Sequence, residues 1–198
     1  MLVSENPCLA LAADFTPEGF LPWRDALTSV ISKRAYVVEE YDASVASPSR
    51  RFRLPAIIAR RSQSATLHRP AAFTRANVFL AYSVLVPDGR ARPRRAAWKC
   101  ALCGEIEHDM SALTFEHVVP RSRGGLSTWS NIALAHASCN HKKGARTLAE
   151  AGLTLHVPLR RPTNRDLATL RLRTQFPTPP QAWRTYLDLV YWTSPIDP

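Results

Sequence analysis

The spacing of apolar positions divides the first part of the chain into short strands and one helix. Residues 8–13 (CLALAA) form an apolar run that predicts a buried strand, with Cys8 as a small buried side chain. Helical spacing predicts a helix over residues 23–34, whose apolar face is formed by Trp23, Leu27, Val30 and Ile31. β-Branched and aromatic residues predict strands at 35–39 and 52–59, joined by a loop at 44–51. Residues 1–66 are therefore expected to form a small α/β unit.

The pattern changes along the rest of the chain. Residues 67–97 are expected to form a basic connector, with a short helix within 70–83 and a basic loop at 87–95 (PDGRARPRR). Strands are predicted at 113–118 and 132–135, followed by a helix that begins near Cys139 and ends at Gly144. Residues 158–198 are rich in Pro and Arg and close with an aromatic segment at 183–192. Its helical spacing is more typical of a docking face than of a base-stacking platform.

Composition and charge narrow the choice of function. The 198 residues are 45% hydrophobic and 21% charged, which fits a globular protein rather than a disordered chain. The formal net charge is +10, and 22 of the 26 cationic residues are Arg, which binds phosphate through a planar fork. Residues 50–95 contain eleven Arg and a single acid, Asp88. Codon bias alone would explain such a count of Arg. The same excess of positive charge also indicates a nucleic-acid partner.

Nothing in the chain indicates a membrane or secretory protein. No segment approaches the roughly 20 consecutive apolar residues needed to cross a bilayer. The first residues lack a basic region, and their apolar run is interrupted by Asp14. We therefore expect a cytoplasmic protein with no membrane partner. Monomer and homodimer both remain open.

Two pairs of potential metal ligands bracket the middle of the chain. Cys100-Ala-Leu-Cys103 forms the first pair, and His136-Ala-Ser-Cys139 forms the second. Two disulfides are an alternative for four cysteines, but three of them stand at metal-ligand spacing, which favours structural zinc. His136 could instead be an ordinary surface or core histidine. We interpret it as the fourth ligand because it stands where that ligand must come from.

A second group of polar residues lies between and beside these pairs. Glu116-His117, Asn131 and Asn140 supply a carboxylate, an imidazole and two amides. Cleavage of a phosphodiester needs a base for the attacking water and a hard cation for the leaving oxygen, and such cations prefer oxygen ligands. Adjacent residues on an ideal strand point to opposite faces, so Glu116 and His117 would need a twist or bulge to converge. His141 is a second choice to Asn140 as metal ligand.

These residues carry a resemblance to a known family. TFEHVVPRSRGG and TWSNIALAHASCNHKKGAR resemble the zinc-stapled branch of the HNH endonucleases, a ββα-metal nuclease superfamily. ADFTPEGFLPW, KRAYVVEEYDASVASPSRRFRLPAIIAR and TLAEAGLTLHVPLRRPT look like one bacterial HNH family. The resemblance implies that His117 is the general base, that Glu116 and Asn140 bind the catalytic metal, and that Asn131 fixes the loop carrying His117. Cys100, Cys103, His136 and Cys139 match the structural zinc ligands.

The chain departs from the family pattern at a few positions. Glu116 stands where the family usually has Asp, His136 replaces a usual Cys, and Asn140 occupies the position of the second His. Residues 84–95 resemble an insertion whose Arg92, Arg94 and Arg95 could lengthen a DNA contact. Paired glycines at 124–125 would permit close approach to a ligand. Cations that flank the site and could contact phosphates are Arg121, Arg123, Lys142, Lys143 and Arg146.

Together these observations predict an α+β protein in which an HNH ββα-metal module at residues 98–157, stapled by Zn²⁺, follows the N-terminal unit. The expected activity is Mg²⁺- or Mn²⁺-dependent hydrolysis of DNA, by nicking, with 5′-phosphate and 3′-hydroxyl products. The alternative is a catalytically weak or inert zinc-stapled module that binds nucleic acid, which the variations at Glu116 and Asn140 favour.

Overall fold

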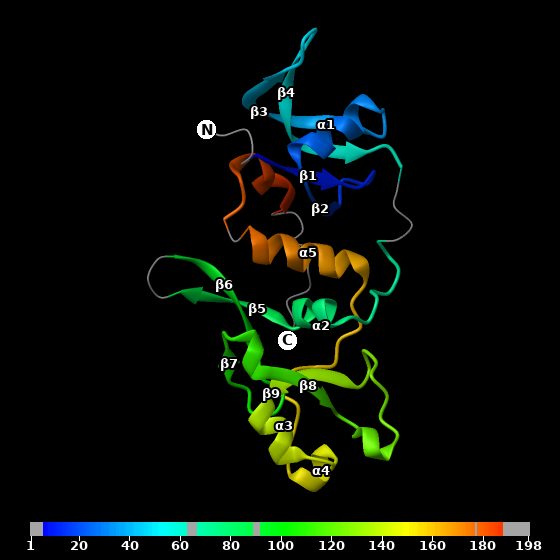
Figure 1. The fold of residues 1–198 in the computed structure, drawn as a ribbon, viewed down its shortest axis with the longest axis vertical. Coiled ribbons are helices and arrows are strands. Elements are labelled where there is room, and N and C mark those ends of the chain that lie inside the picture. The colour runs from blue at the N-terminus through cyan, green and yellow to red at the C-terminus, as the bar shows by residue number, and fades with distance from the viewer. Residues whose placement is uncertain (1–5, 63–66, 89–91, 177, 188–198) are drawn as a thin grey trace. The chain divides into compact units, whose positions relative to one another are not determined.

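The computed structural model describes residues 6–62, 67–88, 92–176 and 178–187, and the side chains of residues 87–95 lie outside this description (Figure 1). The chain divides into two compact units: Met1–Leu67 together with Thr178–Pro198, and His68–Pro177. The expected connector at 67–97 therefore lies mostly inside the second unit. The expected C-terminal segment at 158–198 is divided between the two units. The mixed helix and strand content confirms the α+β class.

In the described residues of the first unit, a four-stranded sheet is accompanied by the helix α1. Its strands follow the order β2-β1-β4-β3, with β1 parallel to β4 and the other pairs antiparallel. Its elements are β1 (Pro7–Leu11), β2 (Pro17–Pro22), α1 (Trp23–Ile31), β3 (Ala35–Ala46), β4 (Arg51–Arg60) and the 3₁₀ turn η4 (Gln181–Trp183). The predicted strands and helix are confirmed, although β3 extends well beyond residue 39 into the expected loop.

The core of the first unit lies between α1 and the sheet. Cys8 is fully buried, as predicted, and burial raises the pKa of its thiol to about 12. The helix contributes Ala26 as its buried residue, and Val30 packs beside it. The predicted apolar face of α1 is wrong at one position, because Ile31 is 60% exposed.

The C-terminal aromatic segment contributes further buried side chains to the first unit. Trp183 is fully buried, and its indole N–H donates a hydrogen bond of 2.9 Å to the backbone oxygen of Ala56 on β4. Leu187 is also buried. The prediction of a docking face is thus confirmed for residues 183–187, and the remainder of that segment, residues 188–192, lies outside the described residues. The first unit therefore buries side chains from near the C-terminus as well as those of its own N-terminal sheet.

The second unit contains two small sheets and several short helices. The strands β5, β6 and β7 form one sheet, and β8 and β9 form an antiparallel hairpin. The bounds are α2 (Arg75–Ala81), β5 (Ser83–Asp88), β6 (Arg92–Lys99), β7 (Ile106–Glu107), η2 (Met110–Ala112), β8 (Leu113–His117), η3 (Arg121–Arg123), β9 (Ile132–His136), α3 (Ala137–Lys143), α4 (Leu148–Ala151) and α5 (Asn164–Gln175). The basic stretch at 87–95, expected to be a loop, contributes to the paired strands β5 and β6.

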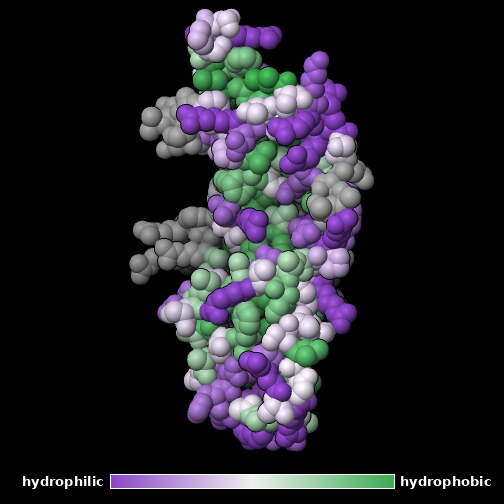
Figure 2. Space-filling view, turned by 45° about the vertical axis from the view of Figure 1, so that its right-hand side comes forward, coloured by the Kyte–Doolittle hydropathy of each residue, from purple (hydrophilic) through white to green (hydrophobic). Residues whose placement is uncertain are grey.

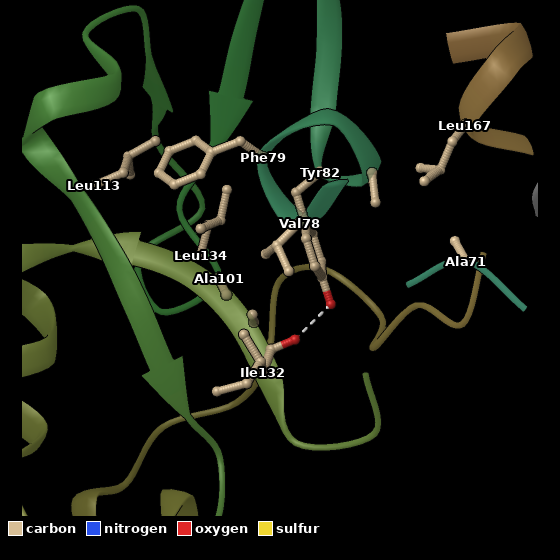
Figure 3. Packing of buried hydrophobic residues seen from close by; sticks show 11 residues of the cluster. Ala71, Val78, Phe79, Tyr82, Ala101, Leu113, Ile132, Leu134 and Leu167 are labelled. Atoms are coloured by element: carbon tan, nitrogen blue, oxygen red, sulfur yellow. Dashed lines mark hydrogen bonds between the residues drawn. The ribbon is translucent and has the colours of Figure 1, made fainter. Parts of the chain in front are cut away.

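A large apolar cluster packs against the β8–β9 hairpin in the second unit (Figure 3). Val78 and Phe79 of α2 lie against Leu113 of β8 and Leu134 of β9. The Tyr82 hydroxyl donates a 2.9 Å hydrogen bond to the backbone oxygen of Ile132, and burial raises the pKa of this phenol. Because the hydroxyl has an acceptor, the ring is buried at little polar cost. This cluster fixes the positions of β8 and β9, and α3 follows β9 directly.

Candidate functional site

The two predicted ligand pairs meet at one point. Cys100 follows β6, Cys103 lies in the next turn, His136 ends β9, and Cys139 lies in the first turn of α3. Their ligand atoms all lie within 4.8 Å of one another, and His136 Nδ1 is 3.4 Å from Cys103 Sγ and 3.8 Å from Cys139 Sγ. A tetrahedral zinc ion with bonds of about 2.3 Å separates neighbouring sulfur ligands by about 3.8 Å. The four side chains therefore fit a structural zinc ion.

Backbone hydrogen bonds shape the first ligand pair. The Gly104 N–H donates to the backbone oxygen of Cys100 (2.9 Å), and Gly104 adopts a φ of +80°, which closes the turn. The Ala101 N–H donates to the backbone oxygen of Leu134, which ties this turn to β9. Burial opposes ionisation of Cys100. Hydrogen bonds from backbone N–H groups, the strongest from His136, nevertheless lower the pKa of its thiol below the ordinary value. A stabilised thiolate is the form that binds zinc.

Glu107 is a site residue that sequence reasoning missed. Its Oε2 lies 3.5 Å from His136 Nε2, while its Oε1 accepts hydrogen bonds from the backbone N–H groups of His108 and Asp109. Those N–H groups lower the pKa of the Glu107 carboxyl, which keeps it ionised. An ionised acceptor at Nε2 favours the tautomer whose Nδ1 carries the lone pair. Nδ1 is the atom that faces the cysteine sulfurs.

The β8–β9 hairpin places Glu116 and His117 in different surroundings. The two strands pair without a register shift from Leu113 opposite His136 to His117 opposite Ile132. The bulge that could have turned both side chains to one face is therefore absent from this pairing. Glu116 is fully buried against α3, whereas His117 Nε2 lies 2.9 Å from the Ser127 hydroxyl in the following loop.

Lys143 forms a buried ion pair with Glu116. Its Nζ lies 2.7 Å from Glu116 Oε1 and donates a 2.9 Å hydrogen bond to the backbone oxygen of His117. Only 2% of Lys143 is exposed, and its charge is paired with Glu116 inside the module. The expectation that Lys143 contacts phosphate on the surface is therefore not met. Burial raises the pKa of the Glu116 carboxyl, and the lysine opposes this shift. Glu116 Oε2 is buried with no hydrogen-bond partner among the described residues.

Asn131 joins the two ends of the loop that follows His117. Its Oδ1 accepts the Val119 N–H at 2.7 Å, and its Nδ2 donates to the backbone oxygens of Val119 (3.1 Å) and Leu126 (3.0 Å). Gly125 lies against the same part of the loop, and a Cβ at this position would stand 1.8 Å from the Val119 oxygen. The close approach that this glycine permits is therefore to the loop's own backbone and not to a ligand. The loop conformation that holds Ser127 beside His117 depends on these contacts.

Asn140 contacts β8 one helical turn before Lys143. Its Nδ2 donates a 2.9 Å hydrogen bond to the backbone oxygen of Phe115, which leaves its Oδ1 as a potential cation ligand. His141, the second choice for this role, is exposed on α3. The structure therefore brings Asn140 and Lys143 to β8, beside the Glu116-His117 pair.

The electrostatic environment keeps His117 in its basic form. Burial lowers the pKa of this imidazole, and the positive charges of Arg121 and Lys143 lower it further. The ring is therefore neutral at pH 7, as a proton acceptor must be.

The remaining predicted cations have varied surroundings. Arg121, whose charge acts on His117, and Lys142 on α3 are exposed, whereas Arg123 pairs with Glu150 at 2.8 Å. Arg146 donates from Nη2 to the backbone oxygen of Lys142 at the end of α3. The side chains of Arg92, Arg94 and Arg95 lie outside the described part of the structure.

Comparison with protein families gives two matches to separate parts of the chain. A family model described as HNH endonuclease matches residues 100–146, which contain all four zinc-ligand candidates and the polar group around His117. A model described as HNH endonuclease-associated, N-terminal domain matches residues 8–66, most of the first unit. Searches of curated proteins and of solved structures found no match. Among the described residues, no helix is both long and apolar enough to cross a membrane.

Proposed function

We propose that this chain, which carries an HNH endonuclease domain and an HNH endonuclease-associated N-terminal domain, hydrolyses DNA phosphodiester bonds in a metal-dependent reaction. An HNH endonuclease domain implies nuclease activity on DNA. The observation that carries the finer proposal is the setting of His117. Burial and nearby cations keep its imidazole neutral at the end of β8. Glu116 precedes it on the same strand, and Asn140 of α3 binds that strand at Phe115.

His117 acts as the general base in this proposal. When its Nε2 carries the proton and donates to the Ser127 hydroxyl, Nδ1 holds a lone pair that can accept a proton from water. The hydroxide so formed attacks phosphorus in line with the 3′-oxygen, and the P–O3′ bond breaks. The leaving 3′-oxygen takes a proton from water, so the products are a 5′-phosphate and a 3′-hydroxyl. Asn131 acts as a positioning residue, since it fixes the loop that carries Ser127.

Glu116 and Asn140 would hold the divalent ion, Mg²⁺ or Mn²⁺. The donor set fits a hard cation, because Glu116 Oε2 has no hydrogen-bond partner within the described part of the chain and the Nδ2 bond to Phe115 leaves Asn140 Oδ1 available. When bound, such an ion stabilises the charge that develops on the leaving oxygen. Glu116 is fully buried, so its carboxylate would have to turn from Lys143 to reach an ion open to DNA.

DNA is the proposed partner of the cations around this site. Arg121, whose charge acts on His117, and Lys142 on α3 are both exposed and could contact phosphates of the bound DNA. One HNH module has one active site, so a monomer would cut one strand at a time.

The Glu116–Lys143 pair favours a second candidate function. A carboxylate that is already neutralised and fully buried is poorly placed to recruit a metal ion. A zinc-stapled module of this kind could bind nucleic acid with weak catalysis or none. Its affinity for DNA would fall steeply with salt, because phosphate contacts release counterions.

Supercoiled plasmid separates these two functions. Wild-type protein with Mg²⁺ or Mn²⁺ is expected to produce open circles, and His117→Ala should lower the rate by about 10²- to 10⁴-fold. His108→Ala removes an exposed histidine of the same unit and serves as the control, with an unchanged rate. Equal nicking by wild type and His117→Ala would reject the assigned base. Salt-sensitive DNA binding without metal-dependent cleavage would establish the second function instead.

A further inference from the structure

The outer half of the β3–β4 hairpin extends beyond the sheet of the first unit (Figure 1). β1 pairs with β4 over Ile57–Ala59, so, among the described strands, the N-terminal part of β4 has only β3 as a neighbour. There Ser44 lies opposite Arg53, Val45 opposite Phe52, and Ala46 opposite Arg51. Residues 44–53 therefore form a two-stranded ribbon, which we call the outer ribbon.

The turn of the outer ribbon is held by its own hydrogen bonds. The Ser47 N–H donates to the backbone oxygen of Arg50 (2.7 Å), and the Ser47 hydroxyl accepts the Arg50 N–H (3.0 Å). The same hydroxyl donates to the Arg50 oxygen (2.9 Å). Arg50 also lies over the Phe52 ring, with 5.6 Å between the guanidinium carbon and the ring centroid. The tip is therefore an ordered element, which lowers the entropic cost of binding a partner.

The charge of the outer ribbon is unbalanced. Arg50, Arg51 and Arg53 fall within four residues. Arg53 is paired with Asp42 (3.1 Å) and Glu40 (3.7 Å), whereas no ion pair within the described part of the chain includes Arg50 or Arg51. Both of these residues are exposed, and hydrophilic colours dominate the tip at the top of the view in Figure 2.

We propose that the outer ribbon is a second DNA-binding element, in which Arg50 and Arg51 contact backbone phosphates of duplex DNA. The inference rests on DNA being the substrate of the proposed function. The major groove of B-DNA, about 12 Å wide, admits a two-stranded ribbon. Arginine binds phosphate through paired N–H donors, and such contacts hold the duplex without reading its sequence. The HNH-associated N-terminal domain thereby holds substrate for the HNH domain.

Binding to a 30-base-pair duplex, followed by fluorescence anisotropy without Mg²⁺ or Mn²⁺ at several salt concentrations, tests the proposal. Arg50→Gln/Arg51→Gln should reduce the slope of log affinity against log salt by about 2 in magnitude, since two phosphate contacts are lost. Affinity should fall alike for unrelated sequences. The control Arg24→Gln/Lys33→Gln removes the same charge from exposed positions of the same unit and should keep the wild-type slope.

Equal loss in both double variants would overturn the proposal, because net charge alone would then explain it. Wild-type binding by Arg50→Gln/Arg51→Gln would overturn it as well and would leave the outer ribbon to another partner. Melting temperatures within about 2 °C of wild type show that the substitutions spare the fold. Ribbon-dependent binding by a protein that does not nick plasmid would support this inference while rejecting the proposed nuclease activity.

Discussion

The Lys143 ammonium lies 2.7 Å from the Glu116 carboxylate, and both side chains are buried between α3 and the β8–β9 hairpin. Lys143 also donates to the backbone oxygen of His117. One lysine therefore balances the carboxylate beside the proposed base and binds the strand end that carries it. The same pair sets the stability of the module and limits how Glu116 can reach a metal ion.

Removal of Lys143 should destabilise the second unit. Lys143→Met leaves Glu116 buried without a counter-charge and should lower the free energy of unfolding by about 3–5 kcal/mol, measured by urea denaturation. The control is Lys142→Met at the exposed neighbouring position, which should change the free energy of unfolding by less than about 0.5 kcal/mol. Adding Glu116→Gln to Lys143→Met should recover part of the loss. Similar stability of the two lysine variants would show that the pair contributes little.

The pH dependence of cleavage follows from the lowered pKa of His117. Burial, Arg121 and Lys143 favour the neutral ring, so kcat/KM should rise with pH below the usual histidine range of about 6.5 and be level at pH 7. Arg121→Gln removes one of these charges and should move the acidic limb to higher pH, whereas Lys142→Gln serves as a comparison. An unmoved limb in Arg121→Gln would mean that another group titrates.

The same shift affects folding stability. Between the lowered folded pKa and the ordinary unfolded value, the unfolded chain binds more protons at His117 than the folded protein does. Stability from this group is therefore present above the unfolded pKa and is lost as pH falls through the folded pKa.

Glu107 should tune zinc affinity without touching the metal. Glu107→Gln removes the charged acceptor at His136 Nε2 and should weaken zinc binding by about 10- to 100-fold, measured by competition with a chromogenic chelator. The exposed Glu105→Gln, two residues earlier, should bind zinc as wild type does. Equal affinities for both variants would remove Glu107 from the zinc centre.

Trp183 should contribute to the first unit as strongly as the core residues of its sheet. Trp183→Ala empties a fully buried site and removes the hydrogen bond to Ala56, so we expect a loss of about 3–5 kcal/mol in thermal or urea unfolding. The partly exposed Trp23→Ala provides the comparison and should cost less. A small effect of Trp183→Ala would contradict its role as part of that core.

Local patterns predicted the elements and ligands that depend on short stretches of sequence. The strands near Cys8 and Leu113, the helix at Trp23 and the two ligand pairs Cys100/Cys103 and His136/Cys139 all follow from spacing within a few residues, and the chemistry of zinc predicts that the pairs converge. Each is decided by periodicity or by ligand chemistry. Both can be read without knowing the rest of the fold.

Contacts between distant segments could not be predicted in this way. Lys143 looks like its exposed neighbour Lys142 in sequence, and only the packing of α3 on β8 buries it with Glu116. Glu107 on β7 reaches His136 on β9 although the two strands belong to different sheets, and Trp183 reaches Ala56 across most of the chain. Such partners carry no fixed spacing. Side-chain type alone therefore favoured the surface interpretation of Lys143.

Anomalous diffraction from crystals of His117→Ala with Mn²⁺ and a short DNA duplex tests the central claim most directly. The account predicts a manganese peak about 2.1 Å from both the Glu116 carboxylate and Asn140 Oδ1, with the scissile phosphate beside it. It also predicts a separate zinc peak at the cysteine cluster. A Glu116 still paired with Lys143, and no manganese beside Asn140, would contradict the proposed catalytic site.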